Sequence, residues 1–139
     1  MEKAEIRTLI RAAFEGQRFA YAPYSRFHVG AALRAKDGRV FKGCNIENAG
    51  YTATNCAERT ALFKAVSEGV REFDAIAIVG SKVGETNTLV TGPCGVCRQA
   101  LYEFGGPELT VIMARSEADY IVTTLGDLLP YGFGPANLE

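Results

Sequence analysis

Two short apolar runs constrain the fold more than any other feature of the sequence. Residues 73–79 read Phe-Asp-Ala-Ile-Ala-Ile-Val, and residues 109–114 read Leu-Thr-Val-Ile-Met-Ala. Each run has the length of one strand and is almost wholly apolar, which is the pattern of a strand covered on both faces. Because such strands need helices above and below their sheet, we expect a layered α/β fold.

The rest of the chain supplies the helices and the further strands. Other strand patterns occur at residues 29–35, 39–45 and 120–122. Helical patterns occur at residues 6–14, 55–67 and 93–104 and after Thr124. The dipeptide Asp37-Gly38 predicts a hairpin turn between two of the strands, and Asn55 is expected to cap the second helix. Strands that alternate with helices indicate one sheet with helices on both of its faces.

Length and charge narrow the classes of function. The 139 residues correspond to about one domain, so 1–139 is expected to be a single domain. Lys and Arg number 15 and Asp and Glu 16, for a net charge of −1, which disfavours a protein that holds long nucleic acid. No apolar run approaches the ~20 residues of a membrane span, and the start lacks a signal-peptide pattern. We therefore expect a cytoplasmic protein without nucleic-acid or membrane partners.

The cysteines are the most informative residues for chemistry. In a reducing compartment, thiols are ligands or catalysts more often than disulfides. Cys94 and Cys97 are three residues apart (97 − 94 = 3), so at the start of a helix both thiols lie on one face. Such a pair is a metal-binding pair, a redox pair or a coincidence. Its late place in the chain disfavours the redox interpretation.

Cys56 is the candidate third ligand. It lies in the first turn of a predicted helix, 38 residues before Cys94 (94 − 56 = 38). Two helices that follow strands in this way can start at one sheet edge, which would bring three thiols between two helix N-termini. Each terminus carries roughly +0.5 charge and favours a thiolate. Arg59 could offset the charge of three thiolates on zinc; otherwise it is a solvated helix residue.

The occupant of the fourth zinc position separates a structural site from a catalytic one. Cys44 could close the site and make a structural zinc module, although a small buried cysteine needs no such role. Glu58 favours the catalytic alternative, because zinc lowers the pKa of a water from about 16 towards about 7 and a nearby carboxylate can take its proton. A glutamate favoured by the helix dipole is the competing interpretation of Glu58.

At this point the residues match a known pattern. Cys-Ala-Glu (56–58) with Pro-Cys-Gly-Val-Cys (93–97) matches the signature of the zinc nucleobase deaminases. The sequence also resembles the small cytidine deaminases at Tyr-Ala-Pro-Tyr-Ser-Arg-Phe-His-Val-Gly-Ala-Ala-Leu (21–33), Asn-Ile-Glu-Asn-Ala (45–49), Cys-Ala-Glu-Arg-Thr-Ala (56–61), Cys-Arg-Gln (97–99) and Leu-Leu-Pro (128–130). The all-cysteine ligand set and the length resemble the homotetrameric branch of that family.

This resemblance implies a three-layer α/β/α domain around a central mixed sheet of about five strands. It implies zinc-dependent hydrolytic deamination of cytidine and 2′-deoxycytidine to the uridines and ammonia, a reaction of pyrimidine salvage. One zinc ion per chain would be held by Cys56, Cys94 and Cys97, with Glu58 as the proton shuttle. The resemblance implies that Phe27 stacks on the base and that the backbone of Cys56 and Ala57 contacts it. Asn45 and Glu47 would hydrogen-bond the ribose 3′-hydroxyl. Tyr51 and Phe133 of neighbouring subunits would close the pocket. Arg59 would offset the thiolate charge, supported by Gln99.

Simpler interpretations stand beside these roles. Phe27 could be an ordinary core aromatic, and Asn45 and Glu47 could serve turn chemistry after a strand. The chain departs from many of the family at Gly92, where they have serine, and His28 occupies a variable position that we assign no catalytic role. The alternative functions are a blasticidin-type aminonucleoside deaminase and a non-catalytic structural zinc module.

Overall fold

The apolar run at residues 73–79 forms the middle strand of a five-stranded sheet. The computed structural model describes residues 1–86 and 89–139, and in them the strand order is β2-β1-β3-β4-β5. The strands are β1 (Phe27–Ala35), β2 (Val40–Cys44), β3 (Phe73–Lys82), β4 (Thr110–Ala114) and β5 (Tyr120–Thr124). Neighbouring strands are antiparallel except β3 and β4, which are parallel. The prediction of a mixed sheet of five strands is confirmed.

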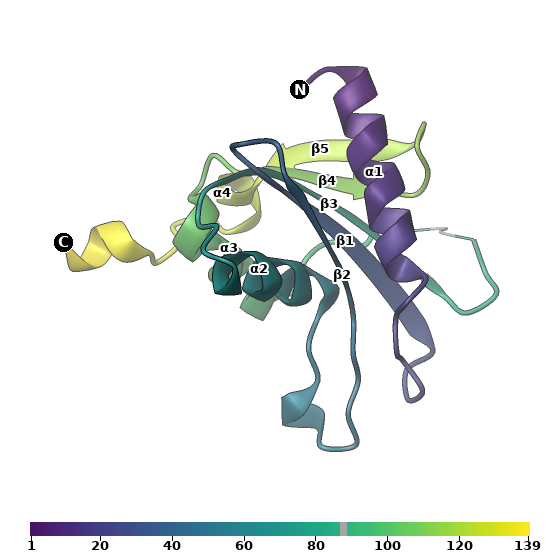
Figure 1. The fold of residues 1–139 in the computed structure, drawn as a ribbon. Helices are drawn as coiled ribbons and strands as arrows, with labels where there is room; N and C mark the ends of the chain where they lie inside the picture. The colour runs from purple at the N-terminus through teal and green to yellow at the C-terminus, as the bar shows by residue number, and fades with distance from the viewer. Residues whose placement is uncertain (87–88) are drawn as a thin grey trace.

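Helices cover both faces of this sheet (Figure 1). Helix α1 (Lys3–Gln17) packs on one face, whereas α2 (Ala57–Ser67) and α3 (Gly95–Gly105) lie on the other. The chain also forms α4 (Leu125–Leu128) and two 3₁₀ turns, η1 (Tyr51–Ala53) and η2 (Pro135–Leu138). Among the described residues, no helix combines the length and the apolar character that crossing a membrane requires.

Alternation along β3 divides the core into two clusters. Ala77 and Val79 face α1, whereas Ile76 and Ile78 face α2 and α3. All four side chains are completely buried. This is the period of two that a strand imposes, with both of its faces apolar because both are covered.

Two glycines set how closely the helices approach the sheet. A Cβ on Gly30 of β1 would lie 2.1 Å from the carbonyl oxygen of Ala13 in α1. A Cβ on Gly43 of β2 would lie 2.4 Å from the carbonyl oxygen of Ala57 in α2. Only glycine leaves room for such contacts between backbones. The start of α2 is therefore held directly against β2.

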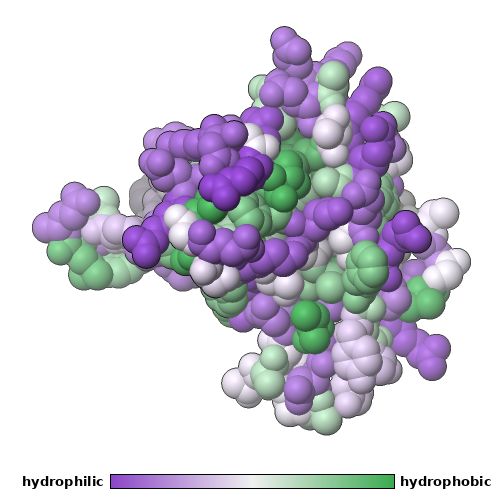
Figure 2. All heavy atoms as spheres, in the orientation of Figure 1, coloured by the Kyte–Doolittle hydropathy of each residue, from purple (hydrophilic) through white to green (hydrophobic). Residues whose placement is uncertain are grey.

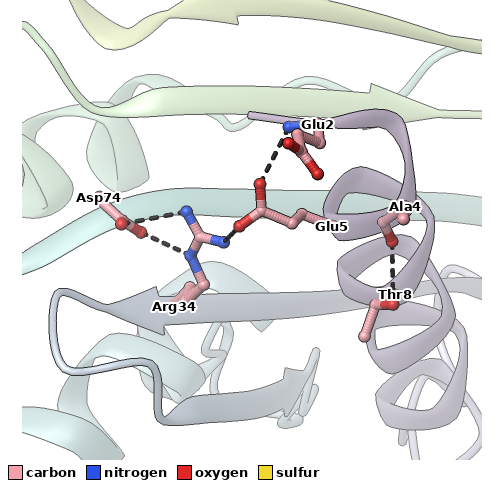
Figure 3. Close-up of polar contacts among 6 residues, drawn as sticks. All are labelled: Glu2, Ala4, Glu5, Thr8, Arg34 and Asp74. Atoms are coloured by element: carbon pink, nitrogen blue, oxygen red, sulfur yellow. Dashed lines mark hydrogen bonds and ion pairs between the residues drawn. The ribbon is translucent and has the colours of Figure 1, made fainter.

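The first turn of α1 is anchored at the C-terminal end of β1 (Figure 3). The carboxylate of Glu5 accepts a hydrogen bond from the backbone N–H of Glu2 at 2.9 Å and another from Arg34 at 3.1 Å. The Arg34 guanidinium also donates two hydrogen bonds to Asp74 of β3, at 2.8 and 3.0 Å. This paired geometry ties one helix and two strands together at the end of β1 opposite Phe27.

The second and third helices start later than predicted. The N-cap of α2 is Cys56 rather than Asn55, and the N-cap of α3 is Cys94. Asn55 is extended because its backbone N–H and carbonyl both bond the backbone of Ile46, each at 2.9 Å. The prediction of Asn55 as the cap is therefore wrong by one residue, and two cysteines occupy the cap positions.

Candidate active site

The three predicted ligands meet where α2 and α3 begin. Cys56 and Cys94 are the N-caps of these two neighbouring helices, and Cys97 lies in the first turn of α3. Their sulfur atoms all lie within 4.8 Å of one another, and those of Cys56 and Cys94 are 3.7 Å apart. Tetrahedral zinc with Zn–S bonds of about 2.3 Å separates its sulfurs by about 3.8 Å. The cluster therefore has the dimensions and the donor atoms that zinc requires.

The charge distribution favours thiolate formation here. A hydrogen bond from the Cys97 thiol, helped by Arg59, lowers the pKa of the Cys56 thiol to about 5, against the opposing effect of burial. The same hydrogen bond and burial raise the pKa of Cys97. Arg59 Nη2 lies 3.2 Å from the sulfur of Cys56, and its buried Nε has no partner within the described residues. The guanidinium beside Cys56 thus keeps one buried N–H donor unpaired among the described residues.

Glu58 is a buried carboxyl next to this cluster. It is the second residue of α2, and 3% of it is exposed. Burial raises the pKa of Glu58 to about 7, and the nearby charge of Cys56 adds to the effect, whereas a hydrogen bond from its own backbone N–H opposes it. A carboxyl that titrates near neutrality can both take up and release a proton.

A cavity of about 240 Å³ opens beside the thiols. Its lining comes from β1, the segment after β2, the start of α2 and the segment before α3, and comprises Val29, Asn45, Glu47, Thr54, Asn55, Cys56, Ala57, Glu58, Thr91, Gly92 and Cys94. Phe27 lines a neighbouring cavity that shares Thr91 with this one. The fold thus brings residues from four segments of the sequence to one hollow at the cysteine cluster.

Two polar side chains at the cavity, those of Asn45 and Glu47, are already held by hydrogen bonds, mostly from or to the backbone. The amide of Asn45 donates to the carbonyl of Phe27 at 2.8 Å, and its oxygen accepts from the N–H of Val29 at 2.9 Å. Glu47 accepts from the backbone N–H groups of Tyr24 and Ser25 at 2.9 and 3.0 Å, and from the Ser25 hydroxyl. The role of Ser25 was missed by sequence reasoning, although it lies within the 21–33 motif.

The other predicted residues lie farther out. Tyr51 and Phe133 are 79% and 58% exposed and do not line the cavity. Gln99, predicted to support the thiolates, donates from its amide to the carbonyl of Phe133 at 2.8 Å. Cys44 is not part of the thiol cluster; it lines a separate cavity with Phe19 and Lys64. Burial raises the pKa of Cys44, as expected for a packed thiol.

Comparisons with known proteins agree with this geometry. Residues 3–113 match the model of the cytidine and deoxycytidylate deaminase zinc-binding region. A cytidine deaminase of Sporosarcina psychrophila is 46% identical over 135 residues, which are 97% of this chain and 96% of that protein. One from Halalkalibacterium halodurans is 50% identical over 125 residues, covering 90% of this chain and 91% of that protein.

A solved structure extends the likeness to the fold. The crystal structure of cytidine deaminase from Burkholderia pseudomallei is 52% identical to this chain and superposes with a TM-score of 0.81. The match covers 91% of this chain and 97% of that one. Sequence, fold and thiol geometry thus agree, and the chain belongs to the cytidine and deoxycytidylate deaminase family of zinc-dependent hydrolytic enzymes.

Proposed function

We propose that this protein deaminates cytidine and 2′-deoxycytidine to uridine and 2′-deoxyuridine, with release of ammonia, in pyrimidine salvage. The observation that carries the proposal is that the buried Glu58 carboxyl lines the same cavity as two of the three clustered thiols. A structural zinc module has no use for such a carboxyl. The enzyme is proposed to act as a single domain, residues 1–139, in the cytoplasm.

Glu58 moves protons in the reaction. Zinc held by Cys56, Cys94 and Cys97 would supply the Lewis acidity that lets a water lose a proton near neutral pH and so become a nucleophile. Glu58 takes a proton from the attacking water and delivers it to ring N3, while the water oxygen bonds to C4. Glu58 then takes the remaining proton from the new C4 hydroxyl and passes it to the exocyclic amino group, which leaves as ammonia as the C4 carbonyl forms. Water is consumed, and the C4–N bond is replaced by a C4–O bond.

The lining residues orient an uncharged nucleoside. Phe27 stacks on the base, and the backbone of Cys56 and Ala57 contacts it. Asn45 and Glu47 bind the ribose 3′-hydroxyl; the Asn45 amide has a second N–H beyond the one bonded to Phe27. Because a carboxylate at the sugar end repels phosphate, the free nucleoside is favoured over its nucleotides.

A homotetramer completes the pocket in this proposal, with Tyr51 and Phe133 of neighbouring subunits closing it. Its support is the exposure of apolar side chains outside the cavity: Tyr51, Tyr131, Phe133 and Leu138 are all more than half exposed. The C-terminal segment projects from the body in Figure 1, and Figure 2 shows apolar atoms on it. Light scattering after size-exclusion chromatography tests the assembly, and a monomer with full activity would contradict it.

Glu58→Gln tests the chemistry, because it keeps the size of the side chain and removes its basicity. We expect the variant to retain one zinc per chain and to lose turnover of cytidine by at least about a thousandfold. Metal analysis and the ultraviolet change from cytidine to uridine are the measurements. Glu68→Gln, at the exposed C-cap of the same helix, is the matched control and should retain wild-type turnover.

The outcomes separate the competing functions. Full activity of Glu58→Gln would overturn the mechanism. Turnover of blasticidin S without turnover of cytidine would assign the protein to the aminonucleoside deaminases. Stoichiometric zinc without turnover of either compound would identify a structural zinc module.

A further inference from the structure

Ser25 connects two residues that the proposed function assigns to different parts of the nucleoside. Its hydroxyl accepts a hydrogen bond from the backbone N–H of Phe27 at 3.0 Å and donates one to Oε2 of Glu47. Its own backbone N–H donates to Oε1 of Glu47 at 3.0 Å. One serine therefore holds the ribose-binding carboxylate and the start of the strand that carries the base-stacking ring.

The local backbone is shaped for this connection. Arg26, between Ser25 and Phe27, has a φ of 57°, a left-handed conformation that residues with side chains adopt rarely. Its N–H donates to the carbonyl of Ala22 at 3.0 Å, which closes a tight turn. A serine hydroxyl that accepts from the N–H two residues later is a recognised turn motif. Such backbone conformations concentrate at functional sites.

Glu47 lines the cavity and keeps hydrogen-bonding capacity there. An ionised carboxylate has about four acceptor positions on its two oxygens. Within the described residues, Oε1 accepts two backbone N–H bonds and Oε2 accepts the Ser25 hydroxyl. These hydrogen bonds, with that from Ser25 as the largest contribution, lower the pKa of Glu47. The carboxylate is thus fixed as an anion, with an acceptor position left on Oε2.

We propose that Ser25 is a positioning residue for substrate recognition, which orients Glu47 towards the sugar 3′-hydroxyl and couples it to the placement of Phe27. This inference rests on the proposed function, in which Glu47 and Phe27 contact the nucleoside. Ser25 itself does not line the cavity at the thiols.

Ser25→Ala tests the proposal on zinc-loaded enzyme, with cytidine and 3′-deoxycytidine as paired substrates. We expect KM for cytidine to rise about tenfold, the effect of losing one hydrogen bond to a charged group, with kcat changed by less than about twofold. The preference for cytidine over 3′-deoxycytidine in kcat/KM should fall by a similar factor of about ten. A merely structural role would not change this preference.

Two variants provide the controls. Ser25→Thr keeps a hydroxyl and should retain most of the preference. Ser116→Ala removes a hydroxyl that accepts from the N–H groups of Ala118 and Asp119, at 3.2 and 3.0 Å, in the turn between β4 and β5. It is expected to leave KM and the preference unchanged.

A double variant tests whether Ser25 acts through Glu47. In a Glu47→Gln background, Ser25→Ala should lower the preference by less than about twofold, because the group that Ser25 orients is already altered. A tenfold fall in that background would overturn the proposal, since Ser25 would then act independently of Glu47.

The remaining outcomes are distinct. If wild-type enzyme prefers cytidine and Ser25→Ala keeps the full preference, the role of Ser25 is overturned and the proposed function stands. If zinc-loaded wild-type enzyme does not deaminate cytidine, the proposed function fails, and the inference about Ser25 fails with it.

Discussion

Replacing Gly43 by alanine should displace the start of α2 and move Glu58 relative to the thiols of α3. The added Cβ would lie 2.4 Å from the carbonyl oxygen of Ala57 and 2.6 Å from the backbone nitrogen of Ala61. Both are backbone atoms of α2, so neither can swing aside as a flexible side chain would. These contacts are made one residue before Glu58 and three residues after it, so a shift of this backbone moves Glu58 directly.

The size of the displacement follows from these distances. Ordinary van der Waals contact begins at 3.4 Å and the closest approach would be 2.4 Å, so the backbones must separate by 3.4 − 2.4 = 1.0 Å. Overpacking of this kind costs about 1–3 kcal/mol of unfolding free energy. Misplacing a catalytic group by about 1 Å lowers the rate by about a hundredfold. We expect both effects in Gly43→Ala.

Urea unfolding and kcat for cytidine measure the two effects separately. Gly95→Ala is the control for stability: Gly95 is the first residue of α3, and its added Cβ meets no atom within 4 Å. That variant should be at least as stable as wild type, because alanine favours a helix by up to about 1 kcal/mol over glycine. A Gly43→Ala protein that is destabilised but keeps wild-type kcat would mean that the edge strand β2 yields instead of α2. This result would refute the link between packing at Gly43 and the position of Glu58.

Three further predictions concern a thiol, an arginine and a carboxylate outside the cavity. Cys44→Ser should keep one zinc per chain and wild-type kcat. Loss of zinc on metal analysis would instead indicate that Cys44 is a fourth zinc ligand. Arg98 donates hydrogen bonds to the carbonyls of Pro93 at 2.7 Å and Leu128 at 2.6 Å, so Arg98→Ala should lower the free energy of unfolding by about 1–3 kcal/mol, measured with urea. The variant should also be digested faster by carboxypeptidase in its C-terminal segment. An unchanged rate of digestion would contradict this role of Arg98. Hydrogen bonds from the backbone N–H of Glu2 and from the Arg34 guanidinium lower the pKa of Glu5 below its usual 4.5. The ionised Glu5 therefore stabilises the fold at a pH above 4.5, and this stabilisation is lost as the pH falls through the lowered pKa. Glu5→Gln should therefore unfold at less urea than wild type at about pH 7, and the difference should shrink as the pH is lowered below 4.5. A difference that stays constant down to the acid unfolding of both proteins would be inconsistent with this linkage.

The layered fold was predictable because its signal is local. Continuous apolar runs such as residues 73–79 and 109–114 indicate strands covered on both faces wherever they occur. The ends of the elements were less predictable. Strand β3 continues through Ser81 and Lys82, since these residues pair with His28 and Phe27 of β1 although they no longer follow the apolar pattern.

The parts of the site that escaped prediction depend on contacts between segments that are not adjacent in the sequence. The start of α2 at Cys56 follows from the backbone pairing of Asn55 with Ile46. The hydrogen bond between the side chains of Ser25 and Glu47 joins residues that are 22 positions apart in the sequence. The periodicity of a sequence does not predict a hydrogen bond between side chains of two separate loops. By contrast, the proximity of the Cys94 and Cys97 thiols was predictable from the sequence, because their spacing at the start of a helix fixes their relative position.

The central place of β3 in the sheet links formation of the metal site to the long-range pairing of strands. Strands β1 and β2 meet across a short turn, whereas β3 reaches β1 across 73 − 35 = 38 residues at one end and 82 − 27 = 55 at the other. Closing long loops costs entropy before any contact compensates for it, so pairings of this kind form slowly. Cys56 precedes β3, and Cys94 and Cys97 follow it. Because the three thiols come from both sides of β3, we expect them to meet only in a chain whose β3 has joined the sheet, and zinc binding would then report on this long-range pairing.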